Sequence, residues 1–277
     1  MSTTERKNEI FGQATTSDSR TAQAPTYDVP VETVPLPSQG KVYPQGSPLC
    51  DKETVDIRSM TAREEDILTS RALIKKGTVM TELVRSCLHT PGVDVDSLLA
   101  GDRNAIMIAI RITGYGAEYN AEIQCKECGE KSEAAFNLSE LGIKNLSITP
   151  VEPGQNLFEV DLPKSKAKVR FKFLTGHDEN DILLEAERRK KVLGTTSESL
   201  VTSKLQRSIV SVSGVTDKSK LPTYIRNMSA FDSRFLRKYM EENEPGVDLT
   251  MWAECRHCNE KQEVQMPIGI KFFWPDN

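Results

Sequence analysis

The chain has 277 residues, enough for two ordinary domains or for one domain built from two intertwined halves. Charged residues make up 27% of it and the formal net charge is −4, which gives no support for broad binding to a nucleic-acid backbone. No apolar run is long enough to span a bilayer, and the N-terminus lacks the apolar core of a signal peptide. We therefore expect a protein that is made and kept in a reducing cytoplasm.

Residues 1–33 are expected to form a flexible N-terminal arm. Up to about residue 30 this segment is rich in Ser, Thr, Gln, Asn and charged side chains, with Phe11 as an isolated aromatic residue. Such a segment cannot bury enough apolar surface to offset the entropy lost on ordering. Two interpretations stay open: a disordered tail, and an extended arm that orders only against a partner.

A proline-rich turn and a capped helix open the first half of the chain, residues 34–150. Three prolines and a glycine within residues 34–44 indicate an extended, turning backbone. Thr61-Ala62-Arg63-Glu64 is a capping-box pattern, because the threonine hydroxyl and the glutamate carboxylate can each bond a free backbone N–H. The helix that begins there should continue unbroken until Gly77 stops it. Further elements expected in this half are a strand over residues 55–60 and helices over residues 79–88 and 103–113, the last one capped by Asp102.

The second half, residues 151–277, is predicted to repeat this plan. Residues 174–183 echo residues 60–68, because each stretch has a capping turn, acidic residues in the first helical turn, and then Asp-Ile-Leu. The offset between matched positions grows from 115 at Asp66 and Asp181 to 130 at the cysteines, as small insertions would cause. Further elements expected here are strands over residues 157–161 and 168–173, helices over residues 178–193, 197–212 and 221–227, a helix capped by Ser229, and an aromatic C-terminal segment over residues 268–275 that is docked or awaits a partner.

Two C-x-x-C pairs, one near the end of each half, are the sharpest signal in the sequence. Cys125-Lys126-Glu127-Cys128 lies between expected strands at 119–124 and 132–137, and Cys255-Arg256-His257-Cys258 lies between expected strands at 249–254 and 262–266. Zinc prefers four soft ligands in a tetrahedron, and each C-x-x-C turn supplies two thiolates. In a reducing compartment the pairs therefore predict one structural zinc per chain, held by Cys125, Cys128, Cys255 and Cys258.

Three alternatives stay open for these cysteines. Each pair could form a disulfide, but C-x-x-C disulfides belong to redox enzymes and usually lie at a helix start, whereas these pairs lie between strands. A zinc ion could be shared between two subunits. His257 could replace one of the cysteines, although a solvated side chain at the turn is the simpler interpretation.

The predicted fold is α+β. It has two pseudo-repeated helical units, each ending in a C-x-x-C hairpin, joined at a shared four-cysteine, zinc-ribbon-like site. Four sulfur ligands leave no open position on the metal, and the sequence has no phosphate-binding glycine loop and no H-E-x-x-H helix, so we expect neither an enzyme nor a small-molecule substrate. A nucleic-acid-binding zinc ribbon is the strongest rival. Its tips usually combine basic and aromatic residues, whereas Lys126 and Arg256 here are flanked by glutamates.

Three stretches carry a family resemblance: Leu36 to Pro44, Met60 to Leu68, and Gly101 to Gly116 leading into the first C-x-x-C pair. They resemble T-even-type baseplate hub and hub-assembly proteins of contractile-tailed bacteriophages. The likeness covers roughly residues 34–140, and the second half matches only through the repeat. It implies a non-enzymatic structural part of the baseplate hub in the virion tail, synthesised in the host cytoplasm, contacting other tail proteins and no membrane. The alternative is an assembly factor that is absent from the mature virion. The resemblance supplies no catalytic residues.

Overall fold

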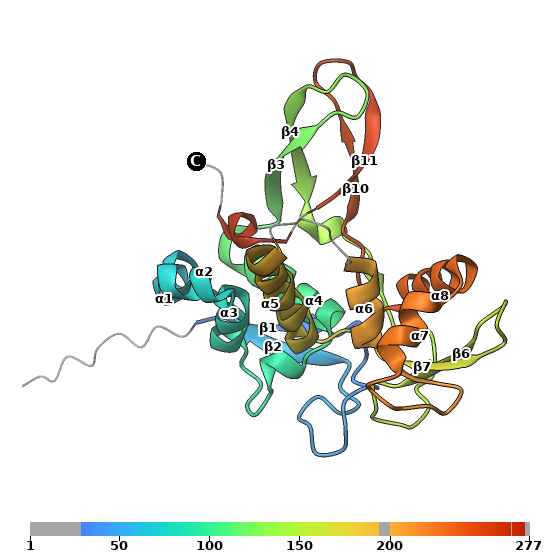
Figure 1. The fold of residues 1–277 in the computed structure, drawn as a ribbon. Coiled ribbons are helices and arrows are strands. Elements are labelled where there is room, and N and C mark those ends of the chain that lie inside the picture. The colour runs from blue at the N-terminus through green and yellow to red at the C-terminus, as the bar shows by residue number, and fades with distance from the viewer. Residues whose placement is uncertain (1–28, 194–199, 267, 275–277) are drawn as a thin grey trace, which may run out of the picture.

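The computed structural model describes residues 29–193, 200–266 and 268–274, which form helices and five small sheets (Figure 1). This confirms the predicted mixture of helices and strands. None of the described helices is long and apolar enough to cross a membrane. Most of the predicted arm, residues 1–28, lies outside the described residues.

A two-stranded hairpin begins the described chain. Strand β1 (Val31–Pro35) pairs antiparallel with β2 (Thr54–Arg58). The predicted arm was expected to extend to residue 33, but residues 31–33 already belong to β1. Strand β1 is anchored to the core by Val34, which is buried and lies opposite Val55 of β2. The other four residues of β1 are exposed.

Three short helices follow: α1 (Ala62–Thr69), α2 (Arg71–Lys76) and α3 (Val79–Cys87). The prediction of one continuous helix up to Gly77 was wrong, because Ser70 leaves the helical region, with φ −65° and ψ 105°. Serine suits such a break, since it competes with helical hydrogen bonds and favours caps. Gly77 ends α2 in a left-handed conformation, as predicted.

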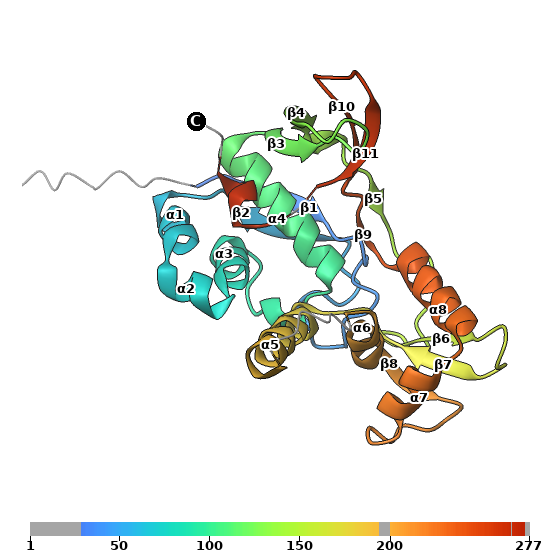
Figure 2. The same ribbon diagram turned by 45° about the horizontal axis from the view of Figure 1, so that its top comes forward.

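Helix α4 (Ala100–Tyr115) runs through the middle of the molecule and is buried on most sides (Figures 1 and 2). The 3-10 turn η2 (Val95–Ser97) precedes it. The prediction that Asp102 caps a helix was wrong, because Asp102 is the third residue of α4. Its buried carboxylate accepts hydrogen bonds from the backbone N–H of Ser38 at 2.8 Å and from the hydroxyls of Ser38 and Tyr43 at 2.6 Å each. Asp102 therefore fixes the proline-rich turn to the central helix.

The second half opens on a three-stranded sheet, in which β6 (Phe158–Asp161), β7 (Lys168–Phe171) and β8 (Ile209–Val212) are antiparallel. Helices α5 (Gly176–Leu193) and α6 (Leu200–Ser208) lie between β7 and β8 in the chain. The predicted helix over residues 197–212 was wrong at its end, where Ile209-Val210-Ser211-Val212 forms β8. Three of these four residues are β-branched and aliphatic, which suits a strand better than a helix. Residues 197–199 lie outside the described chain.

Helices α7 (Leu221–Asn227) and α8 (Ala230–Asn243) complete the second half before its hairpin. Ser229 caps α8 as predicted, because its side chain accepts a hydrogen bond from the N–H of Asp232 at 3.1 Å. The Asp232 carboxylate is itself buried and accepts from the backbone N–H groups of Lys164 at 2.8 Å and Ser165 at 3.1 Å.

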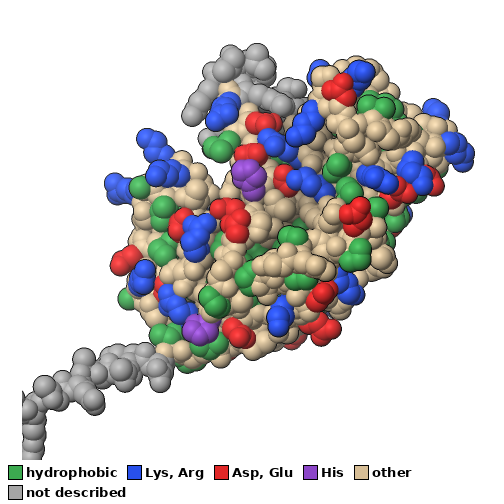
Figure 3. All heavy atoms as spheres, turned by 90° about the horizontal axis from the view of Figure 1, so that it is seen from below, with side chains coloured by type: hydrophobic (Ala, Val, Ile, Leu, Met, Phe, Trp, Pro, Cys, Tyr) green, Lys and Arg blue, Asp and Glu red, His purple; other side chains and the backbone are tan. Residues whose placement is uncertain are grey.

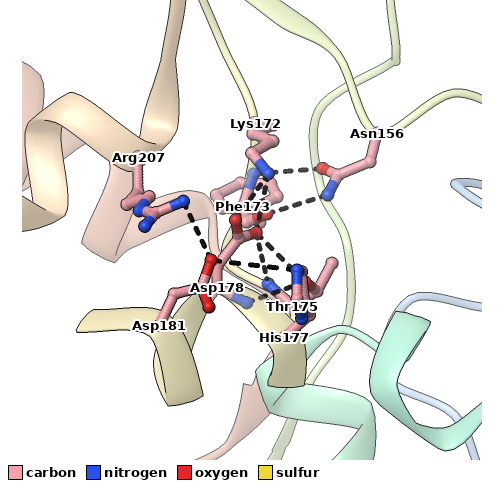
Figure 4. A network of polar contacts seen from close by, with 8 residues as sticks. All are labelled: Asn156, Lys172, Phe173, Thr175, His177, Asp178, Asp181 and Arg207. Atoms are coloured by element: carbon pink, nitrogen blue, oxygen red, sulfur yellow. Dashed lines mark hydrogen bonds and ion pairs between the residues drawn. The ribbon is translucent and has the colours of Figure 1, made fainter. Parts of the chain in front are cut away.

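A matching ion pair follows the first hairpin of each half. Arg58 binds Glu64 at 2.6 Å, and Lys172 binds Asp178 at 2.7 Å, so in both cases the acid lies six residues after the base. In the second half, Thr175 lies between the two members of the ion pair. Its backbone N–H donates to the Asp178 carboxylate at 3.1 Å, and its hydroxyl oxygen accepts from the backbone N–H of Asp178 at 3.3 Å (Figure 4). The predicted capping box of the first half is also present.

The two halves are packed against each other. Buried apolar side chains of both halves form one hydrophobic cluster. The short strand β5 (Ile143–Lys144) of the first half pairs with β9 (Gly246–Val247) of the second. Helix α4 comes so close to the chain at Pro245 that a Cβ on Gly101 would lie 1.8 Å from the Pro245 carbonyl oxygen. Only a glycine fits at this crossing.

Candidate metal centre

Two β-hairpins project together from the helical body, as Figure 1 shows at the top. The first consists of β3 (Glu118–Gln124) and β4 (Lys131–Asn137), and the second of β10 (Thr250–Glu254) and β11 (Lys261–Gln265). Both hairpins are antiparallel, and their strands agree with the predicted ones to within one residue. One cysteine pair lies at each tip.

The two tips have the same backbone conformation. The N–H of Cys125 donates to the carbonyl of Glu130, and the N–H of Cys255 donates to the carbonyl of Glu260, both at 2.9 Å. Each turn then needs one left-handed residue, which is Gly129 with φ 75° in the first and Asn259 with φ 59° in the second. Glycine and asparagine are the residues that adopt this conformation most readily, so the sequence after each pair forms the turn.

The four predicted ligands lie together between the tips. The Sγ atoms of Cys125 and Cys258 are 3.6 Å apart, those of Cys128 and Cys255 are 3.7 Å apart, and all four lie within 4.8 Å of one another. A zinc ion bound to four sulfurs at about 2.3 Å places them about 3.8 Å apart, which these separations match. All four cysteines are free, and a disulfide would require about 2.05 Å between sulfurs. The arrangement thus argues against a disulfide within each pair.

The backbone of the second tip favours a thiolate at the buried end of the cluster. Cys125 and Cys255 are buried, whereas Cys128 and Cys258 are exposed at the rim. The backbone N–H groups of Cys258 and His257 point to the sulfur of Cys255 and lower its pKa to about 6. The imidazole of His257 is left at the exposed turn, while its backbone N–H serves the sulfur.

A side chain that was not among the predicted site residues joins the two tips. Gln262 is buried on β11, where its amide oxygen accepts from the backbone N–H of Lys126 at 2.9 Å and its amide nitrogen donates to the carbonyl of Gln124 at 3.1 Å. Lys126 also donates its ammonium to the carbonyl of Glu263 at 3.2 Å. The sequence signal for this role is weak: a polar residue at an inward position of a strand whose other inward residues are apolar.

The equivalent position of the first hairpin is Ser132, which precedes Gln262 by 130 residues, as Cys125 precedes Cys255. Ser132 is also buried, but its hydroxyl has no hydrogen-bond partner among the described residues. At this strand position the link between the tips therefore comes from the second hairpin's glutamine, in addition to the contact of the Lys126 ammonium with Glu263.

The base of the first hairpin is fixed by Arg111 and by the C-terminal segment. The guanidinium of Arg111 donates to the carbonyls of Gly116 at 2.8 Å, Glu118 at 3.0 Å and Phe272 at 3.0 Å. Phe272, in the 3-10 turn η4 (Ile270–Phe273), packs on Tyr119 of β3 with ring centroids 5.2 Å apart. The aromatic segment is thus docked, which answers the question that its sequence left open for the described residues up to 274.

The chemistry of the cluster is that of a closed site. Four sulfurs match the number and softness of ligands in tetrahedral structural metal sites, and they leave no further position for a substrate or a water molecule. A metal ion is usually bound by histidine, cysteine or acidic side chains. Within the described parts of the chain, it is these four cysteines whose ligand atoms lie close enough together to bind one. The arrangement can hold a metal ion and fasten two hairpins together.

Comparison with known proteins gives one match. A family model described as T4 bacteriophage base plate protein matches residues 30–274, which include both hairpins and all the described helices. A search of curated proteins gave no significant match, and neither did a search of solved structures.

Proposed function

Because the chain belongs to the T4 bacteriophage base plate protein family, we propose that it is a non-enzymatic structural component of a contractile tail baseplate. In this proposal it lies in the hub region of the virion tail and links neighbouring tail proteins. The observation that carries the proposal is the closed cluster of four thiols, because two cysteines come from each half and no ligand position is left for chemistry. A site of this kind stabilises a shape that other proteins can bind.

The metal in this proposal is one zinc ion per chain, held by Cys125, Cys128, Cys255 and Cys258. Its support is geometric: the Sγ atoms of Cys125 and Cys258 are 3.6 Å apart, those of Cys128 and Cys255 are 3.7 Å apart, and all four lie within 4.8 Å of one another, as four ligands of one tetrahedral ion would. Because the ligands come from chain positions about 130 residues apart, binding the metal would contribute directly to the stability of the paired hairpins.

The two halves in this proposal arose by duplication of one unit. The support is a series of matched contacts: the Arg58–Glu64 and Lys172–Asp178 ion pairs, the two threonine caps, and the two C-x-x-C turns with the same backbone hydrogen bonds. In a duplicated protein the metal lies where the two copies meet, which explains why neither copy carries a complete ligand set.

The surface gives less support to nucleic-acid binding. Lys126, Glu127, Arg256 and His257 are exposed at the tips and combine both signs of charge. On the face seen from below, Lys and Arg side chains lie among Asp and Glu side chains (Figure 3). Nucleic-acid-binding surfaces instead gather basic side chains on one face or along one groove.

The test is quantitative mass spectrometry of purified, mature phage tails. We expect this chain at a fixed ratio to other baseplate proteins, and the ratio should persist after a high-salt wash. Absence from mature tails, together with presence in unfinished baseplates, would make it an assembly factor and contradict the structural role. Tight and salt-dependent binding of the purified chain to DNA or RNA at physiological salt would favour the nucleic-acid-binding ribbon instead.

A further inference from the structure

The two hairpins pack face to face below the cysteine cluster but leave a gap on one side. The apolar inward side chains Ile123 of β3, Phe136 of β4 and Met266 after β11 are buried between them. Between β3 and β11 a pocket of about 430 Å³ remains, lined by residues 121–124 and 262–266 together with Lys126 and Phe136. The floor of the pocket is therefore the apolar interior of the paired hairpins.

The walls of this pocket are two strand edges. Directly after β3, the N–H of Cys125 donates to the carbonyl of Glu130, directly before β4. Because alternate residues of an antiparallel pair bond across, the N–H and C=O groups of Asn120, Glu122 and Gln124 point away from β4. By the same alternation, the groups of Lys261, Glu263 and Gln265 point away from β10. The carbonyls of Gln124 and Glu263 confirm this direction, because they accept hydrogen bonds from the opposite hairpin.

Neither edge has a strand partner in the described structure. The sheets β3-β4 and β10-β11 each contain two strands, and no backbone hydrogen bond joins β3 to β11 among the described residues. Unpaired edges with an apolar floor are the arrangement that accepts an added strand. At the end of the gap near the cysteines, the side-chain amide of Gln262 already forms the hydrogen bonds that an added strand would form. It donates to the carbonyl of Gln124 and accepts from the N–H of Lys126, as a peptide group would.

We propose that an extended segment of another protein binds between β3 and β11 as an additional strand. Its N–H and C=O groups would pair with the edge groups of Glu122 on one side, and with those of Gln265 and the N–H of Glu263 on the other, because the Glu263 carbonyl already accepts from Lys126. Alternate side chains of the segment would be apolar and would enter the pocket toward Ile123 and Val264.

The outward side chains of the bound segment should be basic or hydroxylic. They would lie between Glu122 on the outer face of β3 and Glu263 on the outer face of β11, both of which are exposed. Glu122 already pairs with Lys131 at 2.6 Å, so the carboxylate of Glu263 is the main attraction for a basic side chain. Opposite charges on neighbouring strands stabilise a sheet, whereas a third carboxylate would destabilise it. The expected occupant is thus a segment in which apolar residues alternate with lysine, arginine or threonine.

This inference deepens the proposed linking role and rests on it, but its test does not require an assembled tail. The probe is a seven-residue peptide in which valines alternate with lysine and threonine, added to the full-length protein. We expect the backbone N–H groups of Glu122 and Gln265 to exchange more slowly with solvent when the peptide is bound. A control peptide of the same length, with proline in place of each lysine and threonine, should give no protection, because these positions can then not donate an N–H to the edges.

Matched variants separate the strand edge from the side chain. Glu122→Pro removes the N–H that points into the gap but no hydrogen bond to β4, whereas Glu122→Ala keeps that N–H. We expect the peptide to bind about fivefold to tenfold more weakly to the proline variant than to the alanine variant, as the loss of one hydrogen bond implies. Gln265→Pro and Gln265→Ala form the same comparison on β11, so the test survives if one proline variant fails to fold.

Equal binding of the peptide to the proline and alanine variants, or protection of amides elsewhere, would overturn the proposal. Protection of both edges in the protein without peptide would also overturn it, because a segment of this chain or of a second copy would then fill the gap. If the peptide binds as expected but the chain is absent from mature tails, the structural role fails and the strand-binding gap stands. If the chain is present in tails but the peptide does not bind, the gap is not the site of linkage.

Discussion

Asp102 and Asp232 occupy the same place in the two halves of the chain, each as the third residue of its helix and 130 positions apart. Each buried carboxylate accepts backbone hydrogen bonds from a turn that follows a Leu-Pro pair, at Ser38 in the first half and at Lys164 in the second. The contact joins the hairpin at the start of each half to the helix that precedes its cysteine hairpin. It therefore fixes that helix, which leads to the cysteine hairpin, relative to the first hairpin of the half.

Removing either carboxylate should destabilise the protein. Asp102→Ala leaves the buried N–H of Ser38 and the hydroxyl of Tyr43 without their acceptor, so we expect the free energy of unfolding to fall by about 3 kcal/mol. Asp232→Ala should have a similar effect through Lys164 and Ser165. Urea unfolding measures both, with Asp66→Ala on the exposed side of α1 as the control that should stay within about 0.5 kcal/mol of the wild type. Equal effects at Asp66 and Asp102 would contradict this account.

The buried Glu64 carboxylate should make stability depend on pH in acid. Burial by itself would raise the pKa of Glu64, but hydrogen bonds from Arg58, Ser86 and Thr61 outweigh it and lower the pKa to about 2. A carboxylate with a lowered pKa stabilises the fold above its ordinary pKa of about 4.3, and this contribution is lost as the pH falls toward about 2. At neutral pH it contributes about 2 kcal/mol, allowing for the solvent that reaches Arg58.

The measurement for Glu64 is the free energy of unfolding at pH 7 and at pH 3 for the wild type and for Glu64→Gln. The difference between the two proteins should be largest at pH 7 and should shrink at pH 3, because Glu64 of the unfolded wild-type chain is then mostly protonated while the folded carboxylate stays ionised. A difference that stays constant over this range would show that the charge of Glu64 contributes nothing to stability.

One zinc ion per chain is expected from the four thiols. Elemental analysis of protein purified without chelator should give a ratio of about one, and a strong chelator should lower the melting temperature by about 10 °C or more. Cys125→Ser and Cys255→Ser should lose the metal and stability to similar extents, because each removes one ligand from the same cluster. A ratio of zero or two, or a Cys255→Ser variant that keeps its metal, would sink the shared site.

Gln262 and Ser132 occupy equivalent positions of the two hairpins, but replacing each with alanine should change the free energy of unfolding differently. Gln262→Ala should lower the free energy of unfolding by about 1 to 2 kcal/mol, because the N–H of Lys126 and the carbonyl of Gln124 lose their partner. Ser132→Ala should be neutral or stabilising, because the buried hydroxyl forms no hydrogen bond with any residue that the structure describes. Thermal unfolding of the two variants at saturating zinc checks this, and similar losses in both would refute the assigned role of Gln262.

The crossing of Gly101 and Pro245 should tolerate no larger residue. A methyl group on Gly101 would lie 1.8 Å from the Pro245 carbonyl oxygen, so Gly101→Ala must push α4 away from the second half and should cost about 3 kcal/mol or more. Gly142→Ala is the matched control, because the nearest atom to its Cβ would be 4.0 Å away. Chemical unfolding compares the two, and a Gly101→Ala protein as stable as the control would disprove the close contact.

The parts of the structure that the sequence predicts are those set by local patterns. The C-x-x-C hairpins follow from alternating strands around turns that contain Gly129 or Asn259, and the capping box at Thr61 follows from the spacing of two side chains. In each case the interacting groups are a few residues apart. Local chemistry was therefore sufficient to find all four thiols that the structure brings together.

The parts that the sequence does not reveal depend on distant contacts. Ile209 continues an apolar helical stripe in the sequence, and it becomes a strand residue because β7 offers an edge to pair with. The sequence around Asp102 has the pattern of a helix cap, but the Asp102 carboxylate accepts its backbone hydrogen bond from Ser38, in a turn 64 residues earlier. Gln262 acts on Lys126 across 136 residues. None of these partners can be read from neighbouring residues.

The distance along the chain between the two cysteine pairs has a consequence for synthesis. Cys128 emerges from the ribosome 127 residues before Cys255, which at about 5 to 20 residues per second is a delay of roughly 6 to 25 seconds. During that interval the first hairpin has two thiols and no opposing hairpin, and Ile123 and Phe136 have no surface to pack on. Completion of the cluster therefore waits for the second hairpin, and a chain interrupted before Cys255 carries half of the cysteines and an open apolar face.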